Sequence, residues 1–583
     1  MFKRTITRLI IIASVQYCSI HCAVQVPPSG GPVDTIPPSI VETSPSDGET
    51  MVPIDSDFLI TFSEAMDRES VQSALFISPT SQSEHQYSWK RNSLKITFSE
   101  PLNPAKRDRT YIIRIGSSAK DRHNVALERT FTSAFSTGET IDNGMIPGKV
   151  FSDKEGADVQ GAANAVIRAY KLDETSDPNP ILFEGDYITQ ADGEGNFQLT
   201  HLSSGTYRVF AITNDDKDIS FSITTDRIGM PPGDITLDVD EESNPIMFKP
   251  VSIDTLLPRL YLLEIPDRNH IMLHFDKPID KHSLSSQNFR IVQLPEGNVV
   301  SDAIKAYYFT ETSENNVSLY TDALMPDIKY QLIIEHIIDI HGNQLSNYSD
   351  STTIFTCSSR EDTSKFFLET MSPADSTKNI PVYTQIVLKF NQPVEITLLG
   401  EYFQLVDSLE KLISGEFKAL SPAEYHFIPD KSLLSLMTYY IRLNLDSIKS
   451  VEGKPLQLLK SEYTFQTTDI SRTGALIGEI LLTGDSIRAP FMVSLKTKNA
   501  THGQSRSIML DNSRQYEFYG VMPGEYILTA FLDKDNNGEW SAGRLIPYMP
   551  AEPFAVYPEE VTIRPGIENM GINLTLYIHS GKR

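Results

Sequence analysis

Carboxylate and amide side chains alternate in one short acidic segment, Asp533-Lys-Asp535-Asn-Asn537-Gly538-Glu539. Oxygen donors at positions 1, 3 and 5 with glycine at position 6 are typical of a loop that wraps Ca²⁺. The bidentate glutamate expected at position 12 is missing, because Arg544 stands there, and no flanking helices are expected. The segment predicts either a plain Asn/Gly-rich hairpin turn or a looser Ca²⁺ site with the ligands Asp533, Asp535, Asn537 and Glu539.

Few other residues are spaced for chemistry. His270 and His274 share one face of a strand, but the sequence places no further ligand beside them, and we expect a structural role for both. The chain carries no HExxH, GxSxG or P-loop motif. A Ser/His/Asp triad with members far apart in the sequence stays open. We therefore expect a protein without enzymatic activity.

The N-terminus combines three basic residues in its first eight positions with a short apolar run from Leu9 to Val15. This layout predicts a secretory signal over residues 1–21, and the run is too short to span a bilayer. Cys22 follows, and then a Pro/Gly-rich stretch that predicts an extended, flexible tether over residues 22–36. The alternative is an ordinary signal peptide in which Cys18 and Cys22 are incidental.

The run C-A-x-x-x-P-P-S-G-G-P-x-D-T-x-P-P that begins at Cys22 resembles the start of many lipoproteins of Bacteroidota. This resemblance implies a lipid anchor on Cys22 and attachment to the outer membrane. Surface-exported lipoproteins of that phylum often carry acidic residues directly after the cysteine, whereas the first acid here is Asp34. The spacing therefore slightly favours the periplasmic face over the cell surface.

Asp34-Thr35-Ile36 resembles the O-glycosylation sequon of Bacteroidota, which implies a glycan on Thr35. The same short pattern recurs at Asp254-Thr255-Leu256 and Asp485-Ser486-Ile487.

Composition excludes one class of partner. The 583 residues include 51 basic and 76 acidic side chains, a net charge of −25, so a broad basic surface for nucleic acid is not expected. A 40% apolar content is ordinary for folded protein, and the length predicts about four to six domains. Cys357 would be left without a disulfide partner after export, so it is expected to be a small buried residue.

Three segments share a pattern of short alternating strands. In each, a strand ends in Phe and is followed by a polar turn and an acid: FLITFSEAMD (58–67), IMLHFDKPID (271–280) and IVLKFNQPVE (386–395). A strand that opens on tyrosine follows about fifty residues later, and a further strand closes each segment. Period-two alternation between Gly, Asn and Pro clusters predicts half-buried strands joined by turns.

These segments resemble the SbsA-type bacterial Ig-like domain, in which a late D-x-x-G-N-x-L turn follows the Phe strand. The turn is complete at Gly342-Asn343 and altered at His123-Asn124 and Gly453-Lys454. The resemblance implies β-sandwiches that act as spacers or interaction modules, and such a fold does not fix a ligand.

A second repeat fills the gaps between these segments. GKV (148–150) leads to NFQLTHLSSGTYRVFAITNDDKD (196–218), and GEI (478–480) leads to QYEFYGVMPGEYILTAFLDKDNNG (515–538). The Pro-Gly-x-Tyr turn that ends at Tyr526 resembles that of the transthyretin-like (carboxypeptidase regulatory-like) β-sandwich. This resemblance implies accessory modules that are not themselves catalytic.

The predicted fold class is all-β, a tandem array of Ig-like and transthyretin-like β-sandwiches behind a signal peptide and a flexible tether. The predicted order is signal peptide 1–21, lipidated Cys and tether 22–36, Ig-like 37–140, transthyretin-like 144–245, Ig-like 252–358, Ig-like 365–470 and transthyretin-like 474–578.

We expect an outer-membrane-anchored lipoprotein whose modules form a rod, acting as a scaffold or binding module at the cell envelope. Its partners would be the membrane, through the lipid anchor, and envelope proteins or a polysaccharide. The alternative is a surface adhesin or nutrient-capture lipoprotein that binds glycan or protein. A hydrolase with accessory sandwiches is less favoured, and no cofactor is required beyond the Ca²⁺ considered above.

Overall fold

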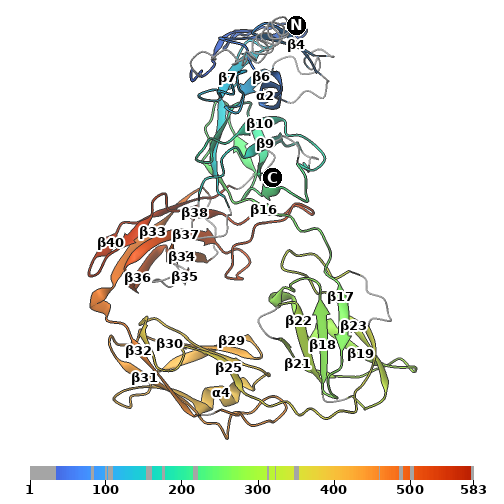
Figure 1. Cartoon of the computed structure of the whole chain (residues 1–583), viewed down its shortest axis with the longest axis vertical. Coiled ribbons are helices and arrows are strands. Elements are labelled where there is room, and N and C mark those ends of the chain that lie inside the picture. The colour runs from blue at the N-terminus through green and yellow to red at the C-terminus, as the bar shows by residue number, and fades with distance from the viewer. Residues whose placement is uncertain are drawn as a thin grey trace, which may run out of the picture. The chain divides into compact units, whose positions relative to one another are not determined.

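The computed structural model describes residues 34–79, 85–98, 102, 109–152, 160–173, 177–213, 221–310, 314–321, 324–346, 353–458, 460–484, 490–498, 505–511 and 513–579. Cys22 and most of the predicted tether lie outside these residues. The chain divides into two compact units, Met1–Ile141 and Asp142–Arg583. The fold is all-β: the described part of the chain forms ten small sheets and a few short helical turns (Figure 1). No helix among the described residues is long and apolar enough to cross a membrane.

Module 1, residues 34–137, lies in the first unit and pairs two sheets. One sheet has the order β1-β2-β5-β4, formed by Ile40–Ser44, Phe58–Phe62, Ser93–Phe98 and His85–Lys90. The other has the order β3-β6-β7, formed by Leu75–Ser78, Thr110–Ile115 and Phe131–Ser136. The alternating residues of these strands fill one core, which includes Phe58, Phe62, Ile96, Ile113 and Phe135.

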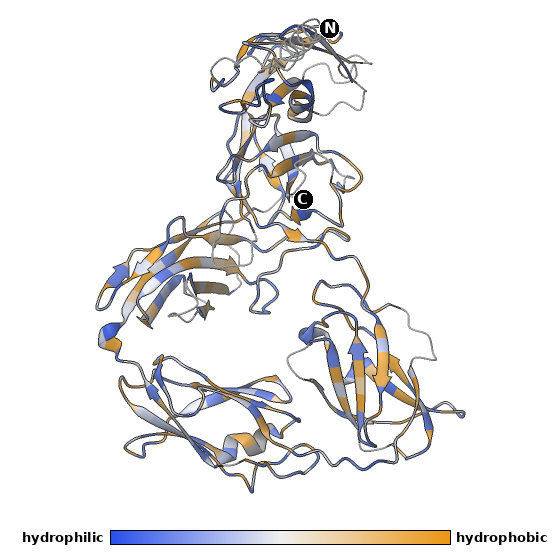
Figure 2. Ribbon diagram, viewed as in Figure 1, coloured by the Kyte–Doolittle hydropathy of each residue, from blue (hydrophilic) through white to orange (hydrophobic). Residues whose placement is uncertain are grey.

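Modules 3 and 4, residues 254–358 and 362–470, repeat this topology in the second unit, and each adds one edge strand to the second sheet. In module 3 the sheets are β17-β18-β22-β21 (Leu260–Glu264, His270–Phe275, Asn316–Thr321, Ile304–Phe309) and β20-β19-β23-β24 (Asn298–Val299, Phe289–Gln293, Lys329–Ile334, Ile354–Thr356). In module 4 they are β25-β27-β30-β29 (Leu368–Ser372, Ile386–Phe390, Glu424–Pro429, Gly415–Ser421) and β26-β32-β31-β28 (Thr377–Ile380, Glu462–Thr467, Thr438–Leu443, Phe403–Asp407). Figure 2 shows hydrophilic and hydrophobic residues following one another along these strands, as the period-two pattern predicts.

The acid that follows each Phe strand marks the start of a short helical turn. Asp67 accepts a hydrogen bond from the amide of Ser70 and caps α2, Arg68–Ser73. Asp280 caps the 3₁₀ turn Lys281–Ser283, and α4 (Ile396–Tyr402) follows Glu395. These turns were not predicted from the sequence, although a side-chain oxygen at the N-cap is a known helix-start signal.

Modules 2 and 5, residues 144–252 and 474–579, share a second topology. In module 2, β8 (Gly144–Val150) lies between β11 (Asn196–Leu202) and a parallel β15 (Ile246–Phe248). In module 5, β33 (Gly474–Thr483) lies likewise between β36 (Gln515–Val521) and the parallel strands β40 (Glu568–Met570) and β41 (Leu574–Tyr577).

The second sheet of modules 2 and 5 is also built alike, around the strand that follows the repeated Gly-x-Tyr turn. That strand is β12 (Gly205–Thr213) beside β9 (Val166–Lys171), and β37 (Gly524–Leu532) beside β34 (Phe491–Thr497). The remaining strands of these sheets are β10 (Tyr187–Gln190), β13 (Arg227–Gly229), β14 (Ile235–Leu237) and β16 (Val251–Ser252) in module 2, and β35 (Arg506–Leu510), β38 (Phe554–Val556) and β39 (Val561–Ile563) in module 5.

The tyrosine of the Gly-x-Tyr turn explains why the motif recurs. Tyr207 and Tyr526 are buried, and each hydroxyl donates a hydrogen bond to the carbonyl four residues earlier, Ser203 at 2.7 Å and Met522 at 2.8 Å. The buried ring is thus satisfied by its own turn, which fixes the entry of β12 and β37 into the sheet.

Modules 2 and 5 contact each other although two modules separate them in the sequence. The guanidinium carbon of Arg208 lies 3.6 Å from the ring centroid of Tyr548, and the amide of Ala551 donates to the carbonyl of Pro231 at 3.0 Å. A rod in which modules 2 to 5 stack end to end would keep modules 2 and 5 apart. The rod expected from the sequence is therefore corrected for the second unit.

Candidate functional site

The predicted calcium loop follows β37 directly. Asp533 is fully buried, and its two carboxylate oxygens accept hydrogen bonds from the amides of Asn537 (3.1 Å) and Gly538 (2.9 Å). Asp535 accepts a hydrogen bond from the hydroxyl of Ser541 at 2.7 Å. Three of the four predicted ligands, Asp533, Asp535 and Asn537, therefore fold onto one turn.

The fourth predicted ligand, Glu539, is not part of this group. Its carboxylate points away to the ammonium of Lys281, 3.3 Å distant, and is 72% exposed. Glu552 takes its place: one carboxylate oxygen from each of Asp533, Asp535 and Glu552 lies within 4.8 Å of the others. No local spacing indicated Glu552, because it enters from the far side of the loop just before β38.

The electrostatics of this loop show how it holds three acids. Glu552 is 3% exposed and accepts a hydrogen bond from the amide of Ser541 at 3.0 Å. Burial, with a contribution from the charges of Asp535 and Asp533, raises the pKa of Glu552. Since every one of these carboxylates already accepts hydrogen bonds from the loop, a plain turn accounts for the arrangement as well as a Ca²⁺ site does, and Ca²⁺ binding here stays a prediction.

Thr35, the predicted glycosylation site, is exposed. Asp34 beside it accepts a hydrogen bond from the amide of Ile36 at 3.1 Å. Asp254, which opens the second match to the sequon, makes the same turn with the amide of Leu256. The Asp-Thr pattern therefore has a structural reason of its own, and a glycan on Thr35 stays a prediction; Cys22 and Asp485-Ser486-Ile487 lie outside the described residues.

His270 joins a group of charges that the sequence did not bring together. It lies on β18 and is 7% exposed, with Nδ1 3.0 Å from Asp267 and Nε2 3.0 Å from Glu452 of module 4. Lys454 of module 4 contacts the same Glu452 at 2.8 Å and also pairs with Asp362. Because Asp362, Glu452 and Lys454 lie in the following module, the local pattern around His270 gave no sign of this group.

The acids around His270 determine its charge. Burial alone would lower the pKa of His270, but the pairs with Asp267 and Glu452 outweigh it and raise the pKa to about 9. The group thus contains two cations of its own, the imidazolium and the ammonium of Lys454, beside its carboxylates. An ion-pair cluster that joins modules 3 and 4 fits this composition better than a metal site, in agreement with the structural role expected for His270.

Cys357 lies just after β24 and is 2% exposed, as predicted for a small buried residue. Burial raises the pKa of its thiol, so the thiolate that a nucleophile needs is disfavoured.

Two segments of the chain match a known family. Residues 34–137 and 362–467, which are modules 1 and 4, match the bacterial Ig-like domain (Big_5). The chain contains two bacterial Ig-like domains. Module 3 shares the core strand order of both, and its opening turn at Asp254 matches the turn at Asp34 in module 1.

Comparison with whole proteins adds no functional information. No curated protein matches the chain in sequence. Solved structures with some similarity include CopC from Methylosinus trichosporium OB3b, at 20% identity over 18% of this chain and 94% of CopC, with a TM-score of 0.15. The N-terminal part of the bacterial S-layer protein SbsC is 13% identical over 37% of this chain and 45% of that one, with a TM-score of 0.16. The Bacteroides ovatus mixed-linkage glucan utilization locus protein SGBP-B, in complex with a mixed-linkage heptasaccharide, is 12% identical over 64% of this chain and 82% of that one, with a TM-score of 0.16.

Proposed function

We propose that this protein is a non-enzymatic lipoprotein, anchored to the outer membrane through Cys22, whose β-sandwich modules act as a scaffold or binding array at the cell envelope. The observation that carries the proposal is the way repeated sandwiches account for the chain. Named strands run from Ile40 to Tyr577, and the longest interval between consecutive strands is the 21 residues from 533 to 553. A separate catalytic domain of ordinary size, about 100–150 residues, has no place between them.

The contact between modules 2 and 5 supports a scaffold whose modules hold fixed positions. Arg208 also donates two hydrogen bonds to Asp234, at 2.7 and 2.9 Å, so its guanidinium is held rigidly beneath the ring of Tyr548. Partners would dock on loops and sheet edges, where backbone groups remain available for pairing. The periplasmic face is the side we favour, with envelope proteins or a polysaccharide as partners.

Two measurements in the native host test this proposal. Metabolic labelling with a clickable palmitate analogue should mark the wild-type chain and not the variant Cys22→Ala, which should leave the membrane fraction. Protease treatment of intact and lysed cells then locates the modules: protection until lysis supports the periplasmic scaffold. Cleavage in intact cells would instead support the surface adhesin or nutrient-capture alternative, and an unlabelled, soluble wild-type protein would contradict the anchor.

A further inference from the structure

Modules 1, 3 and 4 share one small substructure at the start of each module. An aspartate opens it, and its carboxylate accepts a hydrogen bond from the amide two residues later; the pairs are Asp34 with Ile36 (3.1 Å), Asp254 with Leu256 (3.0 Å) and Asp362 with Ser364 (2.7 Å). Five residues after each aspartate, a backbone amide bonds to the side chain that follows the Phe strand, which is Ser63, Asp276 or Asn391. The three aspartates are therefore equivalent positions.

A late turn completes the substructure, and isolated bridges fix its register. The bridges join Met66 to Asp121, Ile279 to Asp339 and Val394 to Ser450. Two residues before the first member of each bridge stand Glu64, Lys277 and Gln392. Four residues after the second member stand Val125, Asn343 and Lys454. The three modules thus share these backbone positions but carry different side chains at them.

In modules 3 and 4 a lysine ammonium compensates the opening aspartate. Lys277 pairs with Asp254 and lies 3.8 Å from Asp339, which is 1% exposed. Lys454 pairs with Asp362 and reaches that residue from the late turn rather than from the Phe strand. The two modules therefore place the same kind of charge at one location from two different positions.

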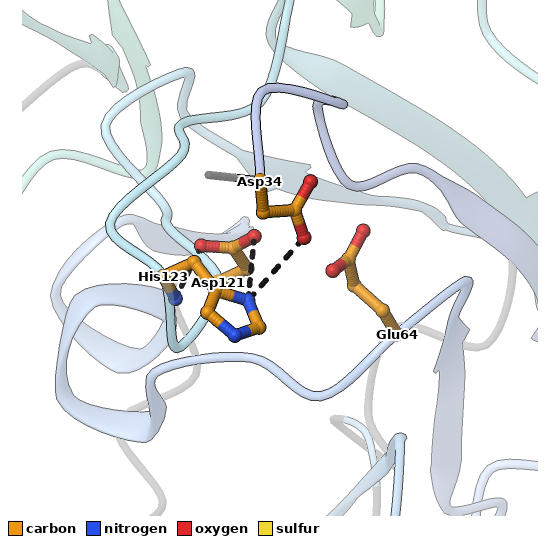
Figure 3. A group of neighbouring side chains, drawn as sticks. All are labelled: Asp34, Glu64, Asp121 and His123. Atoms are coloured by element: carbon orange, nitrogen blue, oxygen red, sulfur yellow. Dashed lines mark hydrogen bonds and ion pairs between the residues drawn. The ribbon is translucent and has the colours of Figure 1, made fainter. Parts of the chain in front are cut away.

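Module 1 has neither lysine. Glu64 stands where module 3 has Lys277, and Val125 stands where module 4 has Lys454. Figure 3 shows the result: the carboxylates of Asp34, Glu64 and Asp121 converge, with the ring of His123 beside them. One ligand atom from each of these four residues lies within 4.8 Å of the others.

Asp121 carries the evidence that this group is incomplete. It is 1% exposed, and its Oδ1 accepts hydrogen bonds from the amides of His123 and Val125, both at 2.8 Å. Its Oδ2 is buried and accepts no hydrogen bond from any residue that the structure describes. In module 3 the corresponding Oδ2 of Asp339 receives the side-chain amide of Asn343 at 3.0 Å and faces Lys277. A buried carboxylate oxygen without a partner is costly, so module 1 needs a cation or a proton there.

His123 does not meet this need. Its Nδ1 lies 3.3 Å from Asp34 and 3.9 Å from Asp121, but the side chain is 65% exposed. A single imidazolium would also leave two of the three negative charges uncompensated. The competing arrangement is a proton shared between Glu64 and Asp121, since burial and the charges of Asp121 and Asp34 raise the pKa of Glu64.

We propose that Asp34, Glu64 and Asp121 bind one Ca²⁺ ion, which does in module 1 what a lysine ammonium does in modules 3 and 4. Carboxylate oxygens are the ligands that Ca²⁺ prefers, and Ca–O distances of about 2.3–2.6 Å suit oxygens up to about 5 Å apart. Zn²⁺ favours nitrogen and sulfur ligands, and the group offers it one nitrogen, on the 65% exposed ring of His123. The ion would fasten Asp34, at the end of the predicted tether, to the late turn of the first Ig-like domain.

The test uses the full chain, stripped of metal with a chelator and titrated with Ca²⁺ in a calorimeter. Hydrogen exchange of peptides covering residues 34–40 and 117–127 reports on module 1 alone. We expect Ca²⁺ to slow exchange in both peptides at least tenfold, and Asp121→Asn to abolish this effect. Asp535→Asn, which alters only the acidic loop of module 5, is the matched control and should leave the module 1 response intact.

A charge-swap variant keeps the test decisive even if Asp121→Asn folds poorly. Glu64→Lys introduces the ammonium of module 3, so it should protect both peptides without Ca²⁺ and remove one equivalent of Ca²⁺ binding. Unchanged exchange on adding Ca²⁺ to the wild type would overturn the proposal and favour the shared proton. Protection by Zn²⁺ but not by Ca²⁺ would overturn the assignment of the ion.

Discussion

Replacing Lys277 with methionine should destabilise module 3, because Asp339 would keep a buried charge with its cation removed. Lys277 is 16% exposed at its side chain, Asp254 is 27% exposed and Asp339 is fully buried. Removing one partner of a buried ion pair costs about 3–5 kcal/mol. We expect the lower end, about 3 kcal/mol, because Asp254 can still be hydrated.

Native-state hydrogen exchange of the full chain in increasing urea gives this free energy for module 3 separately, from peptides of β18 and β23. Lys281→Met is the matched control: it removes a lysine four residues away whose pair with Glu539 is 43% exposed on the lysine side and should contribute under about 1 kcal/mol. A cost for Lys277→Met no larger than that of the control would refute the view that an internal cation stabilises these modules. Lys277→Glu extends the test. It gives module 3 the acid that Glu64 provides at the equivalent position of module 1, so added Ca²⁺ should then make module 3 more stable.

Three further results are expected. The pKa of His270 is raised from 6.5 to about 9, so its pairs stabilise the contact of modules 3 and 4 fully below pH 6.5 and lose that effect as the pH rises through 9. Exchange measured at pH 7 and at pH 10 should show a loss of about 2.5 kcal/mol, which His270→Asn should abolish. The raised pKa of Glu552 means that its charge opposes folding above pH 4.5. Glu552→Gln should therefore leave the thermal stability at pH 7 unchanged or slightly higher. A fall of more than about 1 kcal/mol in the free energy of unfolding would show that the carboxylate itself is required. Tyr548→Leu removes the ring above Arg208 and should weaken the contact of modules 2 and 5 by about 2 kcal/mol, seen as faster exchange in both partners; unchanged exchange would mean that the contact is not formed in solution.

The strands could be predicted because their information is local. Phe62, Phe275 and Phe390 each end a strand with period-two burial, and the structure places them in β2, β18 and β27. The Gly-x-Tyr turn was likewise predictable, since Tyr526 bonds to its own turn. Such features depend on contacts within a few residues, which the sequence shows directly.

The candidate sites were harder to predict because their members come from distant segments. Glu539 fits the calcium spacing yet turns outward to Lys281, while Glu552 completes the group from the start of another strand. Glu452 approaches His270 only because modules 3 and 4 pack together. The order of the modules along the sequence predicts a rod, whereas the ring of Tyr548 lies on Arg208 across two intervening modules.

The repeats supply a comparison that a single domain could not. The Asp-Thr pattern at Asp34 and Asp254 resembles a glycosylation sequon, yet the hydrogen-bonded turn it forms recurs in modules 1, 3 and 4, including Asp362, where the third residue is serine. The three modules thus share the backbone of this substructure, and they differ in which group neutralises its acidic side chains. Lysine does so from one side in module 3 and from the other in module 4. Since the shared backbone accepts a lysine from either side, it requires positive charge at that location rather than a particular residue. Module 1 has an added acid, Glu64, and a buried oxygen of Asp121 that accepts no hydrogen bond from the described residues, and there the proposed Ca²⁺ ion would supply the charge from solution.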